Sequence, residues 1–180
     1  MDITYKYKKI QTYGHPGSCS YYIDKLIHKN FFNSEGSKYE RYKSGDEIII
    51  EPDILYVYVE RKFRYLIKYF YDIKHIYGIP NDISFEVFYK TKYSNMWRMN
   101  SIRNNICILF KDIKMAPRAY WEHHINTWIK ASKNNKNIVM ISYDKTLINM
   151  NSTMKKIATY LGSDKTEFID VKDKVGWIPQ

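Results

Sequence analysis

Apolar residues along the chain form short runs typical of buried strands. Three runs have this character: residues 8–13, Ile54–Val59 and Ile138–Ser142. The run Ile54–Val59 is β-branched and aromatic without clean alternation, which is typical of a parallel-sheet strand buried on both faces. A polar stretch from Asn33 to Gly45 predicts a loop.

Segments in which apolar residues recur with helical spacing separate these runs. We expect helices after residue 20, from residue 63 to a C-cap at Gly78, near Ser84, over residues 102–113, from Pro117, and around Met154 ending at Gly162. Strands alternating with helices predict an α/β fold with a central parallel sheet and right-handed crossovers. The length of 180 residues suits one domain, residues 1–180.

The chain is basic, with 29 Lys and Arg against 19 Asp and Glu, a net charge of +10. This favours anionic partners such as nucleic acid, phosphorylated cofactors or acidic membranes. AT-rich coding would also explain the abundant Lys, Asn, Ile and Tyr, so the charge alone leaves both interpretations open.

The apolar pattern excludes a membrane-spanning helix and argues against a secretory signal. No run of 18 apolar residues appears, so we expect no transmembrane segment, and the N-terminus lacks the apolar region of a secretory signal. Cys19 and Cys107 are isolated, which argues against a disulfide framework or a metal site and suits a reducing cytoplasm. We therefore expect a cytoplasmic protein without a metal.

The turn between the first strand and the first helix is a candidate anion site. It contains Gly14, His15, Gly17, Ser18, Cys19 and Ser20. In a parallel sheet, ligands bind beyond the carboxyl ends of strands, and a helix N-terminus favours phosphate or sulfate. Arg61 follows the Ile54–Val59 strand at the same edge and suits phosphate recognition. An ordinary βα connection and a solvated arginine are the plainer alternatives.

The segments AYWEHHINTWIKA and then NIVMISYDKTLINMNSTMKKIATYLG stand out in the C-terminal half of the chain. Together with segments upstream, they resemble the sulfotransferases that use 3′-phosphoadenosine-5′-phosphosulfate (PAPS). Trp121, His124 and Trp128 match the family's Trp-x-x-His-x-x-x-Trp, and Tyr143 and Asp144 match its Tyr-Glu-Asp-Leu. The segment TYGHPGSCS resembles Thr-Tyr-Pro-Lys-Ser-Gly-Thr-Thr-Trp, and LYVYVERKFRY resembles the strand and helix that carry the family's first arginine. Further matches are SFEVF near residue 84 and the helix end Ile157, Tyr160, Leu161 and Gly162.

The resemblance implies a three-layer, P-loop-like sulfotransferase fold and a PAPS donor. The Gly14–Ser20 turn would cradle the 5′-phosphosulfate, Arg61 would contact the 3′-phosphate, and Tyr143 would lie near the adenine. Lys172 would correspond to the lysine of the family's C-terminal Arg-Lys-Gly motif. The reaction implied is sulfuryl transfer to an unknown hydroxyl or amine acceptor.

The sequence departs from the family pattern at several functional positions. The loop lysine is His15, a serine that helps to bind the 3′-phosphate falls on Tyr69, and the C-terminal arginine is missing. No histidine lies between Ser34 and Pro52 to act as the family's base. His15 is therefore the expected catalytic residue, and a loop histidine without a role is its alternative. We expect His124 to pack rather than react.

Three functions remain open, in this order. The first is a compact sulfotransferase, and the second is a degenerate relative that binds a nucleotide or a protein without catalysis. The third is a nucleic-acid-binding module, in which Lys and Arg interleaved with 18 tyrosines track phosphates and stack bases. No nucleic-acid-binding motif appears, and the tyrosines lie on core-facing stripes as often as on basic ones, so we expect no nucleic-acid partner.

Overall fold

The computed structural model describes residues 5–15, 17–31, 34–38, 48–72, 74, 81–92 and 114–171. The chain divides into two compact units. The first comprises Met1–Glu40, Glu47–Arg61 and Thr127–Gln180, and the second comprises Arg41–Asp46 and Lys62–Asn126. The single domain expected over residues 1–180 stays a prediction.

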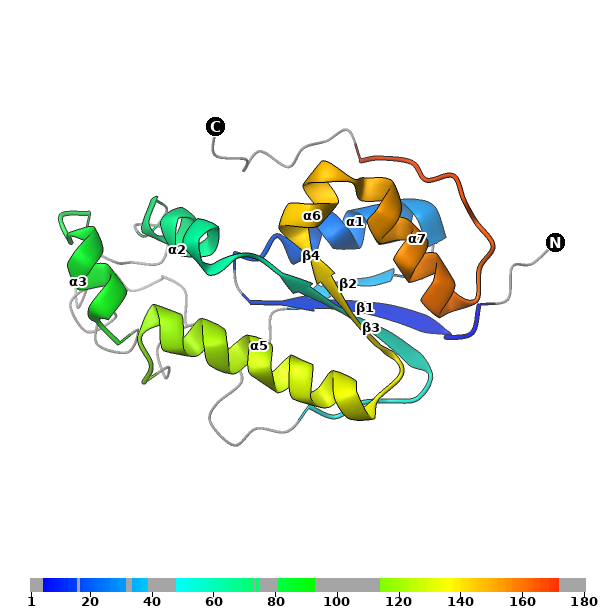
Figure 1. Ribbon diagram of the computed structural model, residues 1–180, viewed down its shortest axis with the longest axis horizontal. Helices are drawn as coiled ribbons and strands as arrows, with labels where there is room; N and C mark the ends of the chain where they lie inside the picture. Colours follow the sequence, from blue (N-terminus) through cyan, green and yellow to red (C-terminus); the bar gives the residue numbers. More distant parts are fainter. Residues whose placement is uncertain are drawn as a thin grey trace. The chain divides into compact units, whose positions relative to one another are not determined.

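The first unit contains a parallel sheet with the strand order β2-β1-β3-β4 (Figure 1). Its strands are β1 (Lys9–Gly14), β2 (Ser34–Lys38), β3 (Ile54–Glu60) and β4 (Ile138–Ser142). β1 runs beside β3 in register from Lys9 opposite Ile54 to Gly14 opposite Val59. This register brings the chain after Gly14 and the chain after β3 to the same edge of the sheet.

Three of these strands confirm the sequence prediction, but β2 corrects it. The stretch from Asn33 to Gly45 was expected to be a loop, whereas Ser34–Lys38 pairs in parallel with β1. The segment SEGSK has neither apolar alternation nor β-branched residues. It forms a strand because backbone N–H and C=O groups beside β1 can pair whatever the side chains are, a tertiary effect that overrides propensity.

Helices α1 (Ser20–Phe31), α6 (Tyr143–Ile148) and α7 (Met150–Leu161) lie on one side of the sheet (Figure 1). Alternate residues of β3, namely Leu55, Val57 and Val59, point to this side and join a core with Ile23 of α1 and Ile157 of α7. α7 ends at Gly162, which has φ 71° and confirms the expected C-cap. The short helix α6, capped by Ser142, lies between β4 and α7 and was not among the predicted helices.

On the other side of β3, Tyr56 and Tyr58 contact Trp128, which belongs to the last turns of α5 (Pro117–Asn134). Trp128 is fully buried, and its ring lies 5.1 Å from the ring of Tyr58 and 4.9 Å from that of Tyr13. Because both faces of β3 are covered, the mixed apolar pattern of the strand is explained, and the α/β three-layer prediction holds in this unit.

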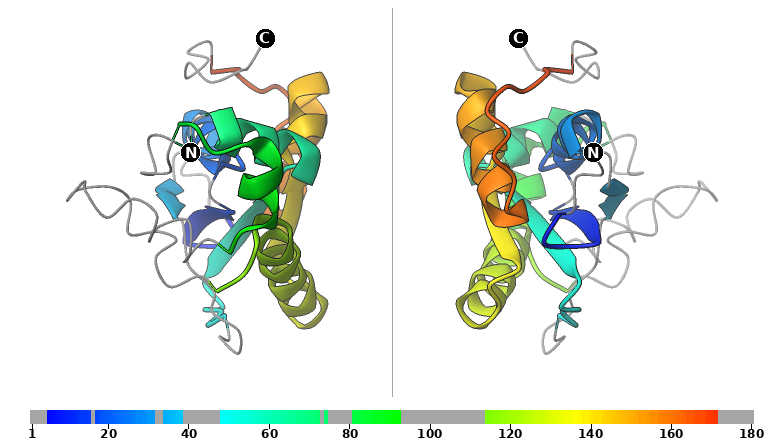
Figure 2. Two further views of the ribbon diagram at one scale, coloured as in Figure 1. Left: turned by 90° about the vertical axis from the view of Figure 1, so that its left-hand side faces the viewer. Right: turned by 90° about the vertical axis from the view of Figure 1, so that its right-hand side faces the viewer.

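The second unit is helical in its described residues (Figure 2). It contains α2 (Phe63–Asp72), α3 (Phe85–Lys90) and the first part of α5. Their shared core consists of Leu66, Ile67, Phe70, Phe88 and Tyr120. The helices expected near Ser84 and from Pro117 are confirmed, whereas the helix expected over residues 102–113 and the C-cap at Gly78 lie outside the described residues.

Candidate functional site

The connection between β1 and α1 is a tight turn with unusual backbone angles. We call it the bend, and it comprises Gly14, His15 and residues 17–20. The amide of Ser18 donates a hydrogen bond to the carbonyl oxygen of His15 at 2.8 Å. Gly17 has φ 83°, and Cys19, which bears a side chain, has φ 62°. A left-handed conformation at a residue other than glycine costs on the order of 1 kcal/mol, so the surrounding contacts hold the bend in this shape.

Gly14 allows the bend to fold back against the sheet. A Cβ atom at this position would lie 2.1 Å from Ser18 Oγ and 3.2 Å from the carbonyl oxygen of Val59. Ser18 is fully buried, and its Oγ finds no hydrogen-bond partner among the residues that the structure describes. A buried hydroxyl in that state carries a desolvation cost, which a bound water or a polar ligand would relieve.

Arg61 lies directly against this bend. Its Nη1 donates to the carbonyl oxygen of Gly17 at 3.1 Å and to Cys19 Sγ at 3.6 Å. Its guanidinium carbon lies 5.4 Å from the centroid of the Tyr143 ring, a cation–π contact. The side chain is 6 % exposed, so the alternative of a solvated arginine is wrong.

Two titratable side chains beside Arg61, Cys19 and Tyr143, have raised pKa values. Burial raises the pKa of the Cys19 thiol, and Arg61 and the Tyr143 hydroxyl only partly oppose this effect. Burial, with a further contribution from Cys19, also raises the pKa of Tyr143. Because the thiol and the phenol stay protonated, neither adds a negative charge beside the Arg61 guanidinium, and the positive charge of this group favours an anion at the bend.

His15, Ser20 and Lys172 complete the set of residues expected from the sequence. His15 and Ser20 are buried in the bend, with His15 only 1 % exposed. Lys172 lies outside the described residues. The structure therefore brings Gly14, Cys19 and Arg61 together with the other bend residues and Tyr143, but covers the imidazole of His15 with protein.

Sequence reasoning missed Tyr22, which packs on Tyr143. The two rings are perpendicular with centroids 5.9 Å apart. In the sequence Tyr22 is one member of an ordinary helical stripe, and no local signal separates it from its neighbours. His124, by contrast, packs as expected: it is buried and makes an edge contact with Tyr120 at 5.9 Å.

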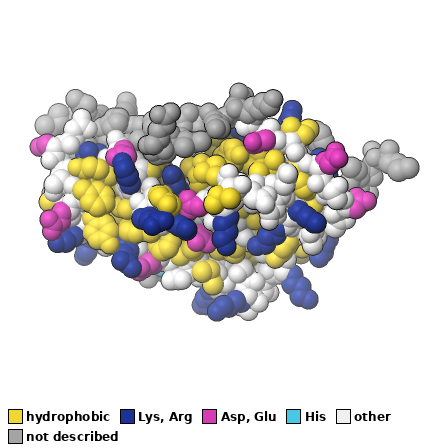
Figure 3. Space-filling view, turned by 45° about the horizontal axis from the view of Figure 1, so that its top comes forward, with side chains coloured by type: hydrophobic (Ala, Val, Ile, Leu, Met, Phe, Trp, Pro, Cys, Tyr) yellow, Lys and Arg dark blue, Asp and Glu magenta, His cyan; other side chains and the backbone are white. Residues whose placement is uncertain are grey.

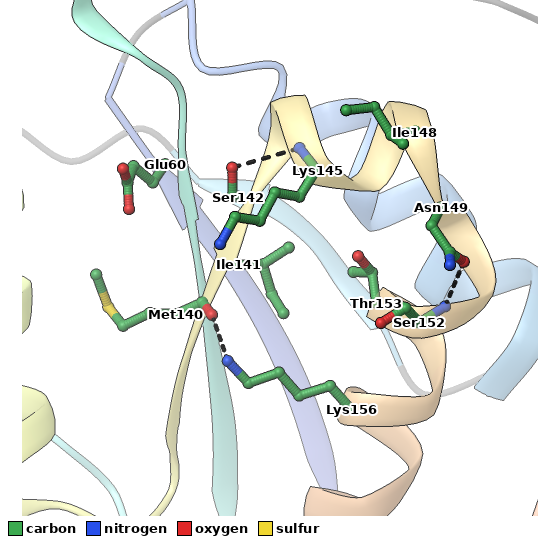
Figure 4. Close-up of a pocket in the computed structure, with 10 residues that line it drawn as sticks. All are labelled: Glu60, Met140, Ile141, Ser142, Lys145, Ile148, Asn149, Ser152, Thr153 and Lys156. Carbon is green, nitrogen blue, oxygen red and sulfur yellow. Dashed lines mark hydrogen bonds between the residues drawn. The ribbon is translucent and has the colours of Figure 1, made fainter.

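A pocket of about 490 Å³ lies beside the outer edge of β4 (Figure 4). It is bordered by Glu60 and Ser142 at the strand ends and by Lys145 and Lys156 from the helices. Lys156 Nζ donates to the carbonyl oxygen of Met140 at 2.9 Å, so this lysine occupies part of the strand edge. A lysine in that position protects an edge strand from pairing with another chain.

Charge is mixed on the face shown in Figure 3, where Lys and Arg side chains are interspersed with acidic and apolar ones.

Within the described ranges, no group of three or more His, Cys, Asp or Glu residues is arranged to hold a metal ion. In the same part of the chain, no helix combines the length and the apolar character needed to cross a bilayer.

Comparisons with known proteins place these features in a family. Residues 42–174 match the family model described as "Sulfotransferase domain". No curated protein sequence matches the chain. Among solved structures, mouse sulfotransferase SULT7A1 complexed with PAP has a similar fold, with a TM-score of 0.57 and 13% sequence identity. The similarity covers 89% of this chain but 60% of the mouse chain, and it confirms the predicted P-loop-like sulfotransferase fold.

Proposed function

The chain belongs to the sulfotransferase family, and we propose that it transfers a sulfuryl group from PAPS to a hydroxyl or amine acceptor. The observation that carries the proposal is the contact between Arg61 and the bend, 3.1 Å from Nη1 to the carbonyl oxygen of Gly17. A guanidinium beside a helix N-terminus and a buried serine hydroxyl is an arrangement suited to a nucleotide with two anionic ends.

The donor would lie with its phosphosulfate in the bend. The backbone amides from Gly17 to Ser20 and the hydroxyl of Ser18 would donate to the 5′-phosphosulfate oxygens, and Arg61 would contact the 3′-phosphate from its place beside Gly17. Tyr143, already in contact with Arg61, would lie on the adenine side. The buried Ser18 Oγ supports this assignment because a ligand oxygen would satisfy it.

The transfer step needs in-line attack and neutralisation of the leaving group. The acceptor oxygen or nitrogen forms a bond to sulfur, and the bond from sulfur to the bridging phosphate oxygen breaks. The leaving group, 3′-phosphoadenosine-5′-phosphate (PAP), departs with that electron pair, and the proton of the acceptor passes to water. We propose that His15 donates a hydrogen bond to the departing oxygen, in the position of the family's loop lysine. Because His15 is 1 % exposed, this role requires the bend to open when the donor binds.

A non-catalytic relative is the second candidate, and two observations favour it. The family model begins its match at residue 42, beyond the bend. The imidazole of His15 is buried, so the side chain at the lysine position does not reach the surface. In this alternative the fold binds PAP or a related nucleotide, but no sulfuryl group is transferred.

Calorimetric titration with PAP tests the donor site. We expect wild type to bind PAP and Arg61→Ala to weaken binding about tenfold or more, because a charge-assisted contact to phosphate is removed. Arg64→Ala is the matched control, since Arg64 is exposed on α2 and bonds to the hydroxyl of Tyr65 at 2.8 Å. Failure of wild type to bind PAP at millimolar concentration contradicts the proposal.

Turnover separates the two candidates. Release of PAP from PAPS is followed with panels of phenols, sugars and amines as acceptors, and His15→Ala is compared with wild type. Loss of turnover with retained PAP binding in His15→Ala supports a catalytic His15. PAP binding by wild type without turnover on any acceptor class favours the non-catalytic relative.

A further inference from the structure

The segment that follows α7, residues 163–171, is hydrogen-bonded to the C-terminal end of α1. Asn30 is 1 % exposed and pairs with the backbone of Ile169 twice: its Nδ2 donates to the carbonyl oxygen at 2.9 Å, and its Oδ1 accepts from the amide at 2.8 Å. Lys165 Nζ donates to the carbonyl oxygen of Asn30 at 2.9 Å. Figure 1 shows this segment leaving α7 and running back past the helices of the first unit.

A continuous series of contacts leads from this segment to the bend. Next to Ile169, the carboxylate of Asp170 accepts a hydrogen bond from the Tyr22 hydroxyl at 3.2 Å. Tyr22 makes an edge contact with Tyr143, and Tyr143 in turn lies against the guanidinium of Arg61. Each step joins side chains of the same compact unit.

We propose that Asn30, Tyr22 and Asp170 are positioning residues for the donor nucleotide. Asn30 fixes Ile169, so Asp170 meets Tyr22, and Tyr22 holds the ring against which Arg61 rests. This inference rests on the proposed function, because it assigns a purpose to the support of Arg61 and Tyr143. Its physical basis is preorganisation: side chains already held in place lose less conformational entropy when the nucleotide binds.

The alternative is that the segment only stabilises the fold. If these contacts are purely structural, their removal lowers the melting temperature but leaves the nucleotide affinity of the folded protein unchanged. The positioning role instead changes PAP affinity in variants that remain folded. It also changes the protection of Cys19, because the Cys19 thiol accepts from Arg61 at 3.6 Å.

The sharpest comparison is Asp170→Ala against Asp170→Asn. Both remove the same negative charge, but only asparagine keeps an oxygen that can accept from Tyr22. Asp170 is exposed, so both variants should fold. We expect Asp170→Ala to bind PAP about threefold to tenfold more weakly than Asp170→Asn, since one hydrogen bond is lost at constant charge.

Tyr22→Phe and Asn30→Ala extend the test. Tyr22→Phe keeps the ring contact with Tyr143 and loses only the hydroxyl, so its effect on PAP affinity should not add to that of Asp170→Ala. Asn135→Ala is the matched control for Asn30→Ala. Each asparagine donates to the carbonyl oxygen four residues earlier: Asn30 to Leu26 at 2.8 Å, and Asn135, just after α5, to Ala131 at 2.8 Å.

A second measurement needs no nucleotide. The rate at which iodoacetamide alkylates Cys19 is followed by mass spectrometry of its peptide, which separates it from Cys107. We expect the rate to rise about threefold or more in Asp170→Ala, Tyr22→Phe and Asn30→Ala, but not in Asp170→Asn or Asn135→Ala, because the loss of one supporting contact loosens the bend.

The outcomes are distinct. Unchanged PAP affinity and unchanged Cys19 alkylation in folded Asp170→Ala and Tyr22→Phe overturn the positioning role, as do additive effects of the two substitutions. If wild type does not bind PAP, the proposed function fails, and Cys19 alkylation alone decides whether the segment supports the bend.

Discussion

Replacement of Gly14 by alanine perturbs the bend at its tightest contact. The added Cβ would lie 2.1 Å from Ser18 Oγ, 3.1 Å from Ser20 Cβ and 3.2 Å from the carbonyl oxygen of Val59. The first contact is far below van der Waals separation. Ser18 is fully buried and cannot swing into solvent, and the oxygen of Val59 belongs to the central strand β3.

The size of the effect follows from these contacts. Overpacking in a filled core costs about 1–3 kcal/mol, and the rigid neighbours of Gly14 place it near the upper end, about 3 kcal/mol. For a chain of this size the melting temperature should then fall by roughly 6–12 °C. PAP binding should be lost, because relief of the clash displaces the serine that we assign to the phosphosulfate.

A double-mutant cycle in urea unfolding tests this origin. Ser18→Ala removes the oxygen that clashes, so Gly14→Ala/Ser18→Ala should recover about half of the lost stability, with the 3.1 and 3.2 Å contacts remaining. Ser18→Ala alone should change stability by about 1 kcal/mol or less, because the removed hydroxyl has no partner among the described residues.

Gly162→Ala is the control for a glycine that lacks this close approach. Gly162 has φ +71°, but a Cβ there would meet its nearest neighbour, Lys6 Cβ, only at 4.0 Å. It should lose about 1 kcal/mol from backbone strain and keep PAP binding. The reasoning is refuted if Gly14→Ala costs less than about 0.5 kcal/mol, or if Ser18→Ala recovers none of the loss.

Three further predictions concern the same unit. Burial raises the pKa of the Cys19 thiol, and burial together with Asp170 raises the pKa of Tyr22 to about 12. The unfolded chain therefore loses these protons first, and the urea midpoint should fall as the pH rises above about 9. Trp128→Ala should lower the free energy of unfolding by about 3–5 kcal/mol, because the indole is fully buried. Ile129→Ala, at a partly exposed neighbour, should lower it by only about 1 kcal/mol, and differential scanning calorimetry of both variants measures the difference. Lys156→Ala should lower the free energy of unfolding in urea by about 0.5–1 kcal/mol, and no change would mean that its bond to the strand edge contributes nothing.

The resemblance to the family depended on local segments, and the later comparisons are consistent with it over residues 42–174. The bend was recognised because glycines precede a helix, and Arg61 because it follows an apolar run at the end of a strand. Neither observation shows how these groups meet. The hydrogen bond from Arg61 to the Gly17 carbonyl joins residues 44 positions apart, and no periodicity encodes it.

The sequence by itself determined where β1, β3, β4 and most described helices lie, because the spacing of apolar residues reflects which side of each element is buried. Only the tertiary structure made a strand of Ser34–Lys38, since pairing with β1 depends on a backbone brought beside it. It also decided that His15 is covered and that Asp170 reaches Tyr22. These features depend on contacts between distant segments, which local composition cannot specify.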